Sequence, residues 1–293
     1  MADDRLQPFL KWPGGKRWLA NTVAALFDKR RRYLEPFLGG GATFFALRPR
    51  RAVLADVNVD LISAFIAVRD QPTTLIRRLS KFRVNKKTFR QFRYASPGSM
   101  LERAIRLMYL NRTAFNGIYR VNADGKFNVP FGCKKGTKLC DSTSLKACSR
   151  ALKGSTLTSG DFRSVLSGAR FSDALYIDPP YTVKHDNNGF RRYNERIFSW
   201  NDQIDLACRL NSLADKGAEV VISNACHTEV SALYSHENFV VTEIARTSCM
   251  AADAQYRGTC KELLLISRSI SQRVDLDGIF GTTGVKGRIV ARL

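Results

Sequence analysis

The stretch Asp178-Pro179-Pro180-Tyr181 holds the residues best suited to chemistry on a heterocyclic amine. It follows the apolar run Ala174 to Ile177, so its carboxylate and ring should stand at the end of a buried strand, where open α/β sheets bind ligands. Two prolines cannot continue a strand ladder, and they fix the Pro179 carbonyl beside Asp178. Two acceptors and one ring fit an exocyclic amine on a stacked base, adenine or cytosine. The alternative is a Pro-rich turn closed by a packed tyrosine.

A second group of residues has the features of a nucleoside site. Phe37-Leu38-Gly39-Gly40-Gly41 joins a strand predicted over 33–38 to a helix predicted over 42–47. A tight glycine turn there lets backbone N–H groups and a helix N-terminus approach a cofactor closely. A second strand, 52–55, ends in Asp56, whose carboxylate can accept both ribose hydroxyls of a nucleoside. The alternative is that Asp56 caps the helix that follows.

The charge of the chain points to a polyanionic partner. Lys and Arg number 47 against 26 Asp and Glu, which gives a net charge of +21. The positive charge concentrates between Arg77 and Arg93, where basic residues, Lys86 and Lys87 among them, alternate with phenylalanines and no acid occurs. Nucleic-acid surfaces have this composition. A solvated helix face with core aromatics is the alternative.

Other features concern compartment and metals. No run of 18 apolar residues occurs and the first residues lack the apolar segment of a signal peptide, so we expect a cytoplasmic protein that makes no membrane contact. The seven cysteines include no CxxC pair, and we expect reduced thiols and no metal site. We expect a monomer or a weak dimer.

Alternating strands and helices, interrupted by an insertion, must position these residues. The alternation breaks near residue 63 and resumes after about 151, with a helix over 201–216 and strands over 156–158, 174–177, 218–222 and 262–266. Within the interruption, the pairs Asn116-Gly117 and Asp124-Gly125 predict a β-hairpin. The sequence predicts a doubly wound α/β domain with an insert, followed by a tail without an interpretable pattern.

Six motifs follow one another along the chain: Lys11-Trp12-Pro13-Gly14-Gly15-Lys16, Glu35 to Gly41, Leu54-Ala55-Asp56, Asn111 to Gly117, Phe127 to Gly132, and Asp178 to Tyr181. In this order and with these gaps they resemble the Dam-type DNA adenine-N6 methyltransferases, the alpha group of the D12 class. The resemblance implies a Rossmann-like catalytic domain that binds S-adenosylmethionine, over 1–62 and 152–270. It also implies a target-recognition domain of helices and a β-hairpin over 63–151, and it leaves 271–293 unassigned. The implied reaction methylates N6 of an adenine rotated out of double-stranded DNA, in a GATC-like site.

The resemblance also implies roles for single residues. Asp178, Pro179, Pro180 and Tyr181 are the catalytic residues, and Asp178 also borders the cofactor. The other cofactor residues are Trp12 and Lys16 at the methionyl carboxylate, the turn Phe37, Gly39 and Gly41, Asp56 at the ribose, and Asp161 and Phe162 at the adenine ring. The residues expected at DNA, beside Lys86 and Lys87, are Lys11, Phe115, Asn116, Ile118, Arg120 and Pro130.

Within this DNA-facing group, Phe115 or Ile118 is expected to fill the space left by the rotated base, with hairpin core as the alternative role. Arg120 is expected to read a guanine, with a phosphate contact or a hairpin cap as the alternative. The chain departs from its relatives in having Phe115 where tyrosine is common and Cys133 where some carry an arginine beside the base. The outer bases of the recognition site are therefore open.

Two other classes of function remain open. One is an RNA adenine-N6 or DNA cytosine-N4 methyltransferase, although serine usually replaces the first Asp in the cytosine enzymes, and positive charge does not distinguish RNA from DNA. The other is a catalytically inactive DNA-binding relative, which the intact glycine turn, Asp56 and Asp178 disfavour. A restriction pair, a phage and a housekeeping system are equally compatible with the sequence.

Overall fold

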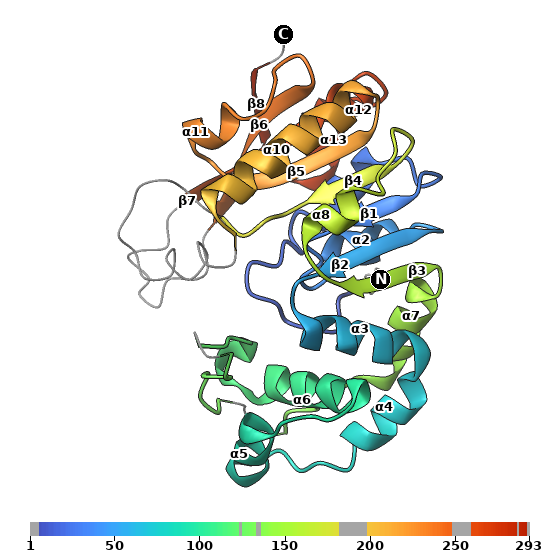
Figure 1. Cartoon of the computed structure of the whole chain (residues 1–293), viewed down its shortest axis with the longest axis vertical. Helices are drawn as coiled ribbons and strands as arrows, with labels where there is room; N and C mark the ends of the chain where they lie inside the picture. Colours follow the sequence, from blue (N-terminus) through green and yellow to red (C-terminus); the bar gives the residue numbers. More distant parts are fainter. Residues whose placement is uncertain are drawn as a thin grey trace. The chain divides into compact units, whose positions relative to one another are not determined.

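The structure is a computed structural model that describes residues 6–122, 125–132, 136–181, 198–247, 259–285 and 287–291. It contains two compact units, called unit 1 and unit 2 here, whose elements are shown in Figure 1. Unit 1 comprises Met1–Trp18 and Leu38–Phe162, and unit 2 comprises Leu19–Phe37 and Arg163–Leu293. These limits follow chain contacts, and the functional division at residues 63 and 151 stays a prediction.

Unit 1 is built on two parallel strands and the helices around them. Strand β2 (Ala52–Asp56) pairs with β3 (Ser155–Ser159), so that Asp56 lies opposite Ser159 at the carboxyl ends of both strands. Helix α3 (Val59–Asp70) follows β2 and contacts α6 (Met100–Thr113) and α7 (Ser142–Leu152). The other helices of this unit are α2 (Ala42–Leu47), α4 (Pro72–Leu79) and α5 (Lys86–Tyr94).

Side-chain caps set where the long helices of unit 1 begin. The Asn58 side chain accepts a hydrogen bond from the Leu61 N–H at 3.0 Å, so Asn58, and not Asp56, is the N-cap of α3. The alternative role of Asp56 as that cap is therefore wrong. Helix α6 starts with a capping box between Ser99 and Glu102. Such caps supply partners to N–H groups that the helix cannot pair.

Aromatic rings join α5, α6 and the segment predicted as a hairpin. Phe92 stacks on Tyr109 with ring centroids 4.3 Å apart. Phe89 is buried, and its ring lies 6.2 Å from Phe127 and 5.3 Å from Phe131. Phe89 thus belongs to the core and Phe82 and Phe92 are half-buried, while Lys86, Lys87 and Arg90 are exposed. The alternative prediction of core aromatics is therefore confirmed for Phe89, and the exposed side of α5 carries positive charge.

The antiparallel hairpin predicted between residues 111 and 132 is confirmed. Ala114 pairs with Phe131 and Val121 pairs with Phe127. The placement of one turn was wrong, because Asn116 (φ +54°) and Gly117 (φ +69°) belong to the 3-10 turn η1 (Phe115–Gly117), which lies between the two bridges and not at the tip of the hairpin. Left-handed backbone suits a helix-like turn as well as a hairpin tip. Asp124 lies outside the described residues.

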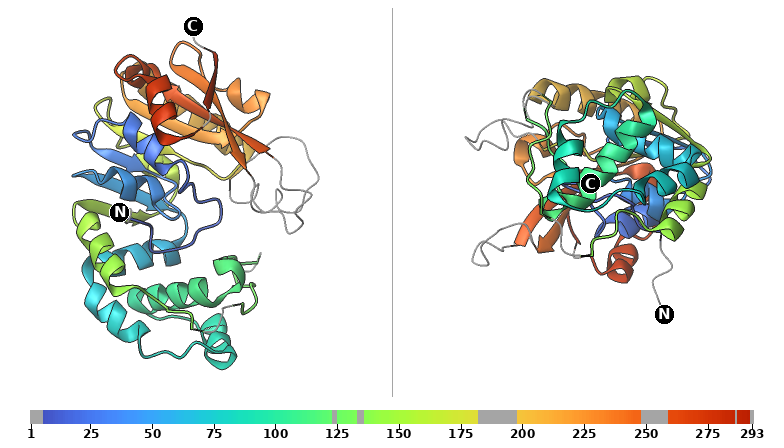
Figure 2. Two further views of the ribbon diagram at one scale, coloured as in Figure 1. Left: turned by 180° about the vertical axis from the view of Figure 1, so that it is seen from behind. Right: turned by 90° about the horizontal axis from the view of Figure 1, so that it is seen from below.

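Unit 2 is a mixed sheet with the strand order β1-β4-β5-β7-β6-β8. The strands β1 (Tyr33–Glu35), β4 (Ala174–Ile177) and β5 (Glu219–Ala225) are parallel. The strands β7 (Thr259–Ser267), β6 (Phe239–Thr247) and β8 (Gly287–Ala291) continue the sheet antiparallel, and β6 and β7 lie side by side in Figure 2. Parallel strands joined by helices in both units confirm the predicted α/β class, which is Rossmann-like.

The helices among the described residues of unit 2 precede these strands or lie between them in sequence. They are α1 (Ala20–Leu26), α8 (Phe162–Leu166), which begins at the last residue of unit 1, α10 (Trp200–Asp215), α11 (Thr228–Ser231), α12 (Arg268–Ser271) and α13 (Leu276–Thr283). The tail 271–293 thus contains α13 and β8. No helix within the described ranges is long and apolar enough to cross a membrane.

Candidate active site and nucleic-acid interface

The predicted catalytic tetrapeptide stands at the end of β4, which runs between β1 and β5. All four residues of β4 are buried, and Asp178, which follows, is half-buried. An Asp178 oxygen, Oδ1, accepts a 2.9 Å hydrogen bond from the Ser223 hydroxyl on β5. The Ser223 hydroxyl is also 3.1 Å from the Tyr176 hydroxyl on β4.

The ring of Tyr181 is held from a more distant strand. Its hydroxyl donates a 3.1 Å hydrogen bond to Glu262 on β7, and the Glu262 side chain is itself buried. Burial, with the nearby charges of Asp178 and Glu262, raises the pKa of Tyr181 well above its ordinary value. Tyr181 therefore stays a hydrogen-bond donor. The sequence predicted neither Ser223 nor Glu262, because which strands lie beside β4 depends on strand order.

In unit 1, Asp56 closes the glycine turn. Its carboxylate accepts hydrogen bonds from the Gly39 N–H at 3.0 Å and from the Asn58 N–H at 2.9 Å, one on each oxygen. Gly39 (φ +49°) and Gly41 (φ +67°) have left-handed backbone, which favours glycine at both positions. Burial raises the pKa of Asp56, and the two N–H bonds only partly offset this. Each carboxylate oxygen can accept a further donor, so two hydroxyls would fit.

The predicted loop residue Trp12 packs over this turn. A Cβ atom at Gly39 would lie 3.0 Å from Cδ1 of Trp12, and one at Gly40 would lie 3.4 Å from its Cβ. The Trp12 ring also stacks on Tyr119 with centroids 5.9 Å apart and planes at 17°. Lys16, from the same loop, has only 6% of its surface exposed. Loop, glycine turn and hairpin are therefore in contact within unit 1.

The predicted pair Asp161 and Phe162 follows β3, and so comes to the same strand end as Asp56. The Gly160 N–H donates to the Asp56 carbonyl at 3.1 Å, which ties this turn to β2. Asp161 is exposed and Phe162 is buried. Phe37 belongs to unit 2, where its ring lies edge-on to Phe198 at 5.6 Å.

Asn111 joins the N-terminal loop to the hairpin. It is fully buried, and its amide donates to the Lys11 carbonyl at 2.6 Å and to the Gly117 carbonyl at 2.9 Å. Its oxygen accepts from the Lys11 N–H at 3.1 Å. The neighbouring Tyr119 donates to Asp60 at 2.8 Å. Sequence reasoning missed the structural role of Asn111, although the residue stands in a motif.

Most side chains predicted to face DNA are accessible. Phe115 is 53% exposed, so its alternative role as hairpin core is wrong, while Ile118 is half-buried. Asn116, Arg120 and Pro130 are exposed, as is Lys11. The Arg120 Nε donates to the Asn128 oxygen across the hairpin at 2.9 Å. Cys133 lies outside the described residues.

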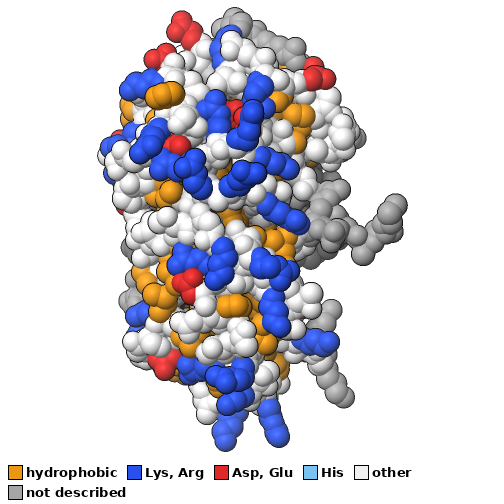
Figure 3. Space-filling model, turned by 90° about the vertical axis from the view of Figure 1, so that its right-hand side faces the viewer, with side chains coloured by type: hydrophobic (Ala, Val, Ile, Leu, Met, Phe, Trp, Pro, Cys, Tyr) orange, Lys and Arg blue, Asp and Glu red, His pale blue; other side chains and the backbone are white. Residues whose placement is uncertain are grey.

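Helix α5 presents the exposed basic residues of the predicted interface. Lys86 and Lys87 occupy its first turn after the N-cap Asn85, and that turn contains no acid. Positive charges at this end oppose the helix dipole and do not stabilise the helix. Figure 3 shows a face of the protein on which Lys and Arg side chains are spread widely, with few acidic side chains among them. Lys86 and Lys87 are therefore better placed to contact an anionic partner than to stabilise α5.

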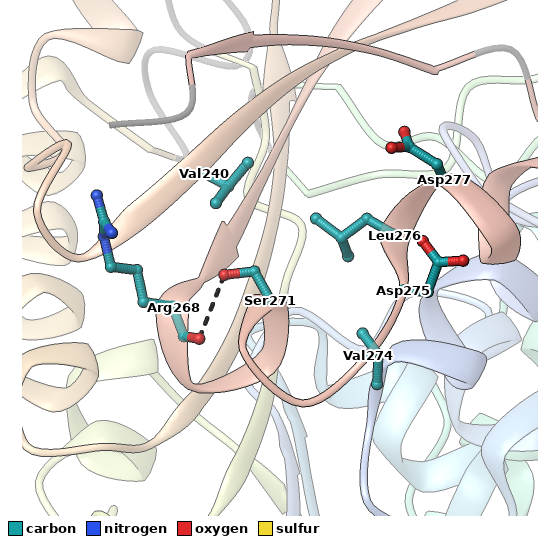
Figure 4. Close-up of a pocket in the computed structure, with 7 residues that line it drawn as sticks. All are labelled: Val240, Arg268, Ser271, Val274, Asp275, Leu276 and Asp277. Atoms are coloured by element: carbon teal, nitrogen blue, oxygen red, sulfur yellow. Dashed lines mark hydrogen bonds between the residues drawn. The ribbon is translucent and has the colours of Figure 1, made fainter.

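The other side-chain clusters and the pocket described here add no residue to the predicted site. In the part of the chain that the structure describes, no group of three or more His, Cys, Asp or Glu could hold a metal ion. A pocket of unit 2 is shown in Figure 4, where the Ser271 hydroxyl donates to the Arg268 carbonyl at 3.2 Å. Its lining residues, none of them predicted for the site, are Val240, Arg268, Ser271, Val274, Asp275, Leu276 and Asp277.

The chain belongs to the family of D12 class N6 adenine-specific DNA methyltransferases, which matches residues 12–248. This confirms the resemblance that the six motifs indicated. Among its relatives, the type II methyltransferase M1.LlaDCHI of Lactococcus lactis subsp. cremoris is 36% identical over 271 residues, 89% of this chain and 95% of the relative. The type II methyltransferase M.MjaIII of Methanocaldococcus jannaschii is 31% identical over 248 residues, 76% of this chain and 86% of the relative. The DNA adenine methylase of Haemophilus influenzae is 30% identical over 269 residues, 89% and 93%.

Proposed function

We propose that this adenine-specific DNA methyltransferase takes its methyl group from S-adenosylmethionine and transfers it to N6 of an adenine rotated out of duplex DNA, in a GATC-like site. The observation that supports this most is the arrangement at the end of β4. There Asp178 is held by Ser223, and the Tyr181 ring is held by Glu262. A fixed carboxylate and a fixed ring are the groups that an amine on a stacked base requires.

The proposed chemistry follows from the weakness of N6 as a nucleophile. Its lone pair is delocalised into the adenine ring. Asp178 and the Pro179 carbonyl accept the two N–H bonds, which favours a pyramidal nitrogen and localises the lone pair. The same bonds stabilise the positive charge that develops on nitrogen during transfer. S-Adenosylmethionine, when bound, supplies a methyl group activated by its sulfonium sulfur.

The residues of unit 1 fit such a nucleoside cofactor. The Asp56 carboxylate has room for two hydroxyl donors, and burial raises its pKa, so ribose hydroxyls would stabilise its charged form. Trp12 and Lys16 take the methionyl end, and Asp161 and Phe162 take the adenine ring. We infer these roles from the family pattern, together with the packing of Trp12 against the glycine turn and the position of Asp161 and Phe162 after β3.

Recognition of DNA is assigned to the hairpin and α5. Because N6 is paired inside a duplex, the base must rotate out at a cost of a few kcal/mol, which stacking on Tyr181 offsets in part. Phe115, more exposed than Ile118, is the better placed of the two to fill the vacated space. Asn128 holds the Nε edge of Arg120, and the terminal nitrogens of the guanidinium are the atoms that pair with guanine O6 and N7.

The site and the product are tested together by expressing the chain in cells whose own DNA is unmethylated and mapping modified bases. We expect N6-methyladenine at a GATC-like sequence. N4-Methylcytosine, a mark confined to RNA, or no mark at all would each contradict the proposal. A different adenine context would overturn only the GATC assignment.

The role of Asp178 is tested with Asp178→Ala. Loss of an acceptor used in the transition state costs on the order of 10²-fold in rate or more, and we expect duplex binding to persist. The matched control is Asp215→Ala, which removes an exposed carboxylate at the end of α10. Labelled-methyl transfer at near wild-type rate by Asp178→Ala would eliminate the mechanism.

A further inference from the structure

Behind the catalytic tetrapeptide lies a short chain of hydroxyl groups. Ile177 of β4 is in register with Ile222 of β5, so the next residues, Asp178 and Ser223, are neighbours at the strand ends. Ser223 is fully buried and Tyr176 is 2% exposed. Hydrogen bonds link Asp178 to Ser223 at 2.9 Å and Ser223 to Tyr176 at 3.1 Å.

The direction of this chain follows from counting protons. An ionised carboxylate carries no proton, so Ser223 must be the donor to Asp178. A serine hydroxyl has one proton, which means that Ser223 accepts in its contact with Tyr176 and that Tyr176 donates. Burial and the charge of Asp178 raise the pKa of Tyr176 well above its ordinary value, which keeps it protonated. Tyr176 therefore donates to Ser223, and Ser223 donates to Asp178.

We propose that Ser223, with Tyr176 behind it, is a positioning residue for methyl transfer: its hydrogen bond to Oδ1 of Asp178 fixes the orientation of the carboxylate that binds the amine. This inference rests on the role of Asp178 in the proposed function. A carboxylate rotates readily about its last side-chain bond, and a buried donor on one oxygen removes that freedom. The benefit is expected in the rate of transfer more than in binding.

This series of hydrogen bonds holds Asp178 in place and does not carry protons away from it. Its inner end is the buried, protonated Tyr176, which has no capacity to take up a further proton. A buried hydroxyl in a strand also costs free energy unless it is hydrogen-bonded, and valine would suit the buried strand β5 better. The polar residue at this strand end is accounted for by its contact with Asp178.

The test compares Ser223→Ala with Ser223→Thr and Tyr176→Phe in full-length enzyme, measuring kcat and KM for duplex and cofactor, with thermal unfolding alongside. We expect Ser223→Ala to lower kcat by roughly 10- to 100-fold while both KM values change by less than about threefold. Ser223→Thr keeps the hydroxyl and should retain more activity than Ser223→Ala. Tyr176→Phe should have a smaller effect, because it acts only through Ser223.

The matched control is Ser267→Ala, which removes a fully buried serine on β7 that accepts from the Val220 N–H at 2.9 Å. It should destabilise the fold comparably and leave kcat unchanged. Adding Ser223→Ala to Asp178→Ala should cost no further activity, because the two act as one unit. Full kcat in Ser223→Ala, or an equal kcat loss in Ser267→Ala, would overturn this inference alone. An inactive wild-type enzyme would instead overturn the proposed function on which it rests.

Discussion

The carboxylate of Asp56 offers the most direct test of the cofactor site. It already accepts one N–H bond on each oxygen, from Gly39 and Asn58, and we propose that two ribose hydroxyls complete its acceptors. Asp56→Asn removes the charge and turns one acceptor into a donor that must face an N–H group or a hydroxyl. Hydrogen bonds to charged groups are worth about 1.5–3 kcal/mol and neutral ones about 1 kcal/mol.

The expected loss of cofactor affinity is therefore about 1–3 kcal/mol, or roughly 5- to 160-fold in Kd. Isothermal titration calorimetry with S-adenosylmethionine measures it directly. Asp70→Asn, which removes the exposed partner of Arg69 at the end of α3, is the matched control and should bind normally. Unchanged affinity in Asp56→Asn would remove Asp56 from the cofactor site.

The same experiment has a pH dependence of defined sign. Burial raises the pKa of Asp56, and ribose hydroxyls donate stronger hydrogen bonds to the ionised form than to the protonated one. Affinity should be complete above this raised pKa and decline as the pH falls through it, beginning at a higher pH than for an ordinary aspartate. Asp56→Asn should lack this decline. An identical decline in wild type and variant would assign it to another group.

Three further predictions concern DNA. Replacing Lys86 and Lys87 by alanine should weaken binding to all duplexes alike and make the slope of log K against log salt shallower by up to about two, whereas a changed recognition site would mean that these lysines read bases. Methylation profiling of Arg120→Ala should show relaxed preference at one G·C pair, a loss of about 1–3 kcal/mol of discrimination, while uniformly lower activity would mean a backbone contact. Glu262→Ala should release the Tyr181 ring, so that fewer target bases stay rotated out and 2-aminopurine at the target position fluoresces less in the complex. Glu262→Gln should have a smaller effect. Equal fluorescence in the wild type and both variants would mean that Glu262 does not support base stacking.

Local patterns predicted those site residues whose position depends on their own strand. Asp178 follows an apolar run and Asp56 ends one, and both stand at strand ends as expected. Ser223 and Glu262 reach the tetrapeptide from other strands, and strand order is a long-range property that no local pattern contains. The helix α13 was missed because Gly278 and Gly281 lie inside it, and glycine disfavours helices.

The loop with Trp12 and Lys16 became visible only through family resemblance. It contains neither a strand nor a helix period, and its role depends on the glycine turn against which Trp12 packs. The turn at Asn116 and Gly117 shows the opposite failure, since a strong local signal predicted the wrong kind of turn. Left-handed backbone is a local requirement that more than one structure can impose.

The hydrogen bonds that Asn111 makes to Lys11 and Gly117 limit how sequence specificity can be redesigned. A hairpin exchanged from a relative at residues 115–130 would arrive without the buried amide that binds Gly117 and Lys11. It would also have to supply a ring that matches Trp12 at the position of Tyr119. The unit of exchange is therefore larger than the residues that face DNA: a functional graft includes the last turns of α6 and the loop around Lys11, which makes altered specificity and intact cofactor binding a joint design problem.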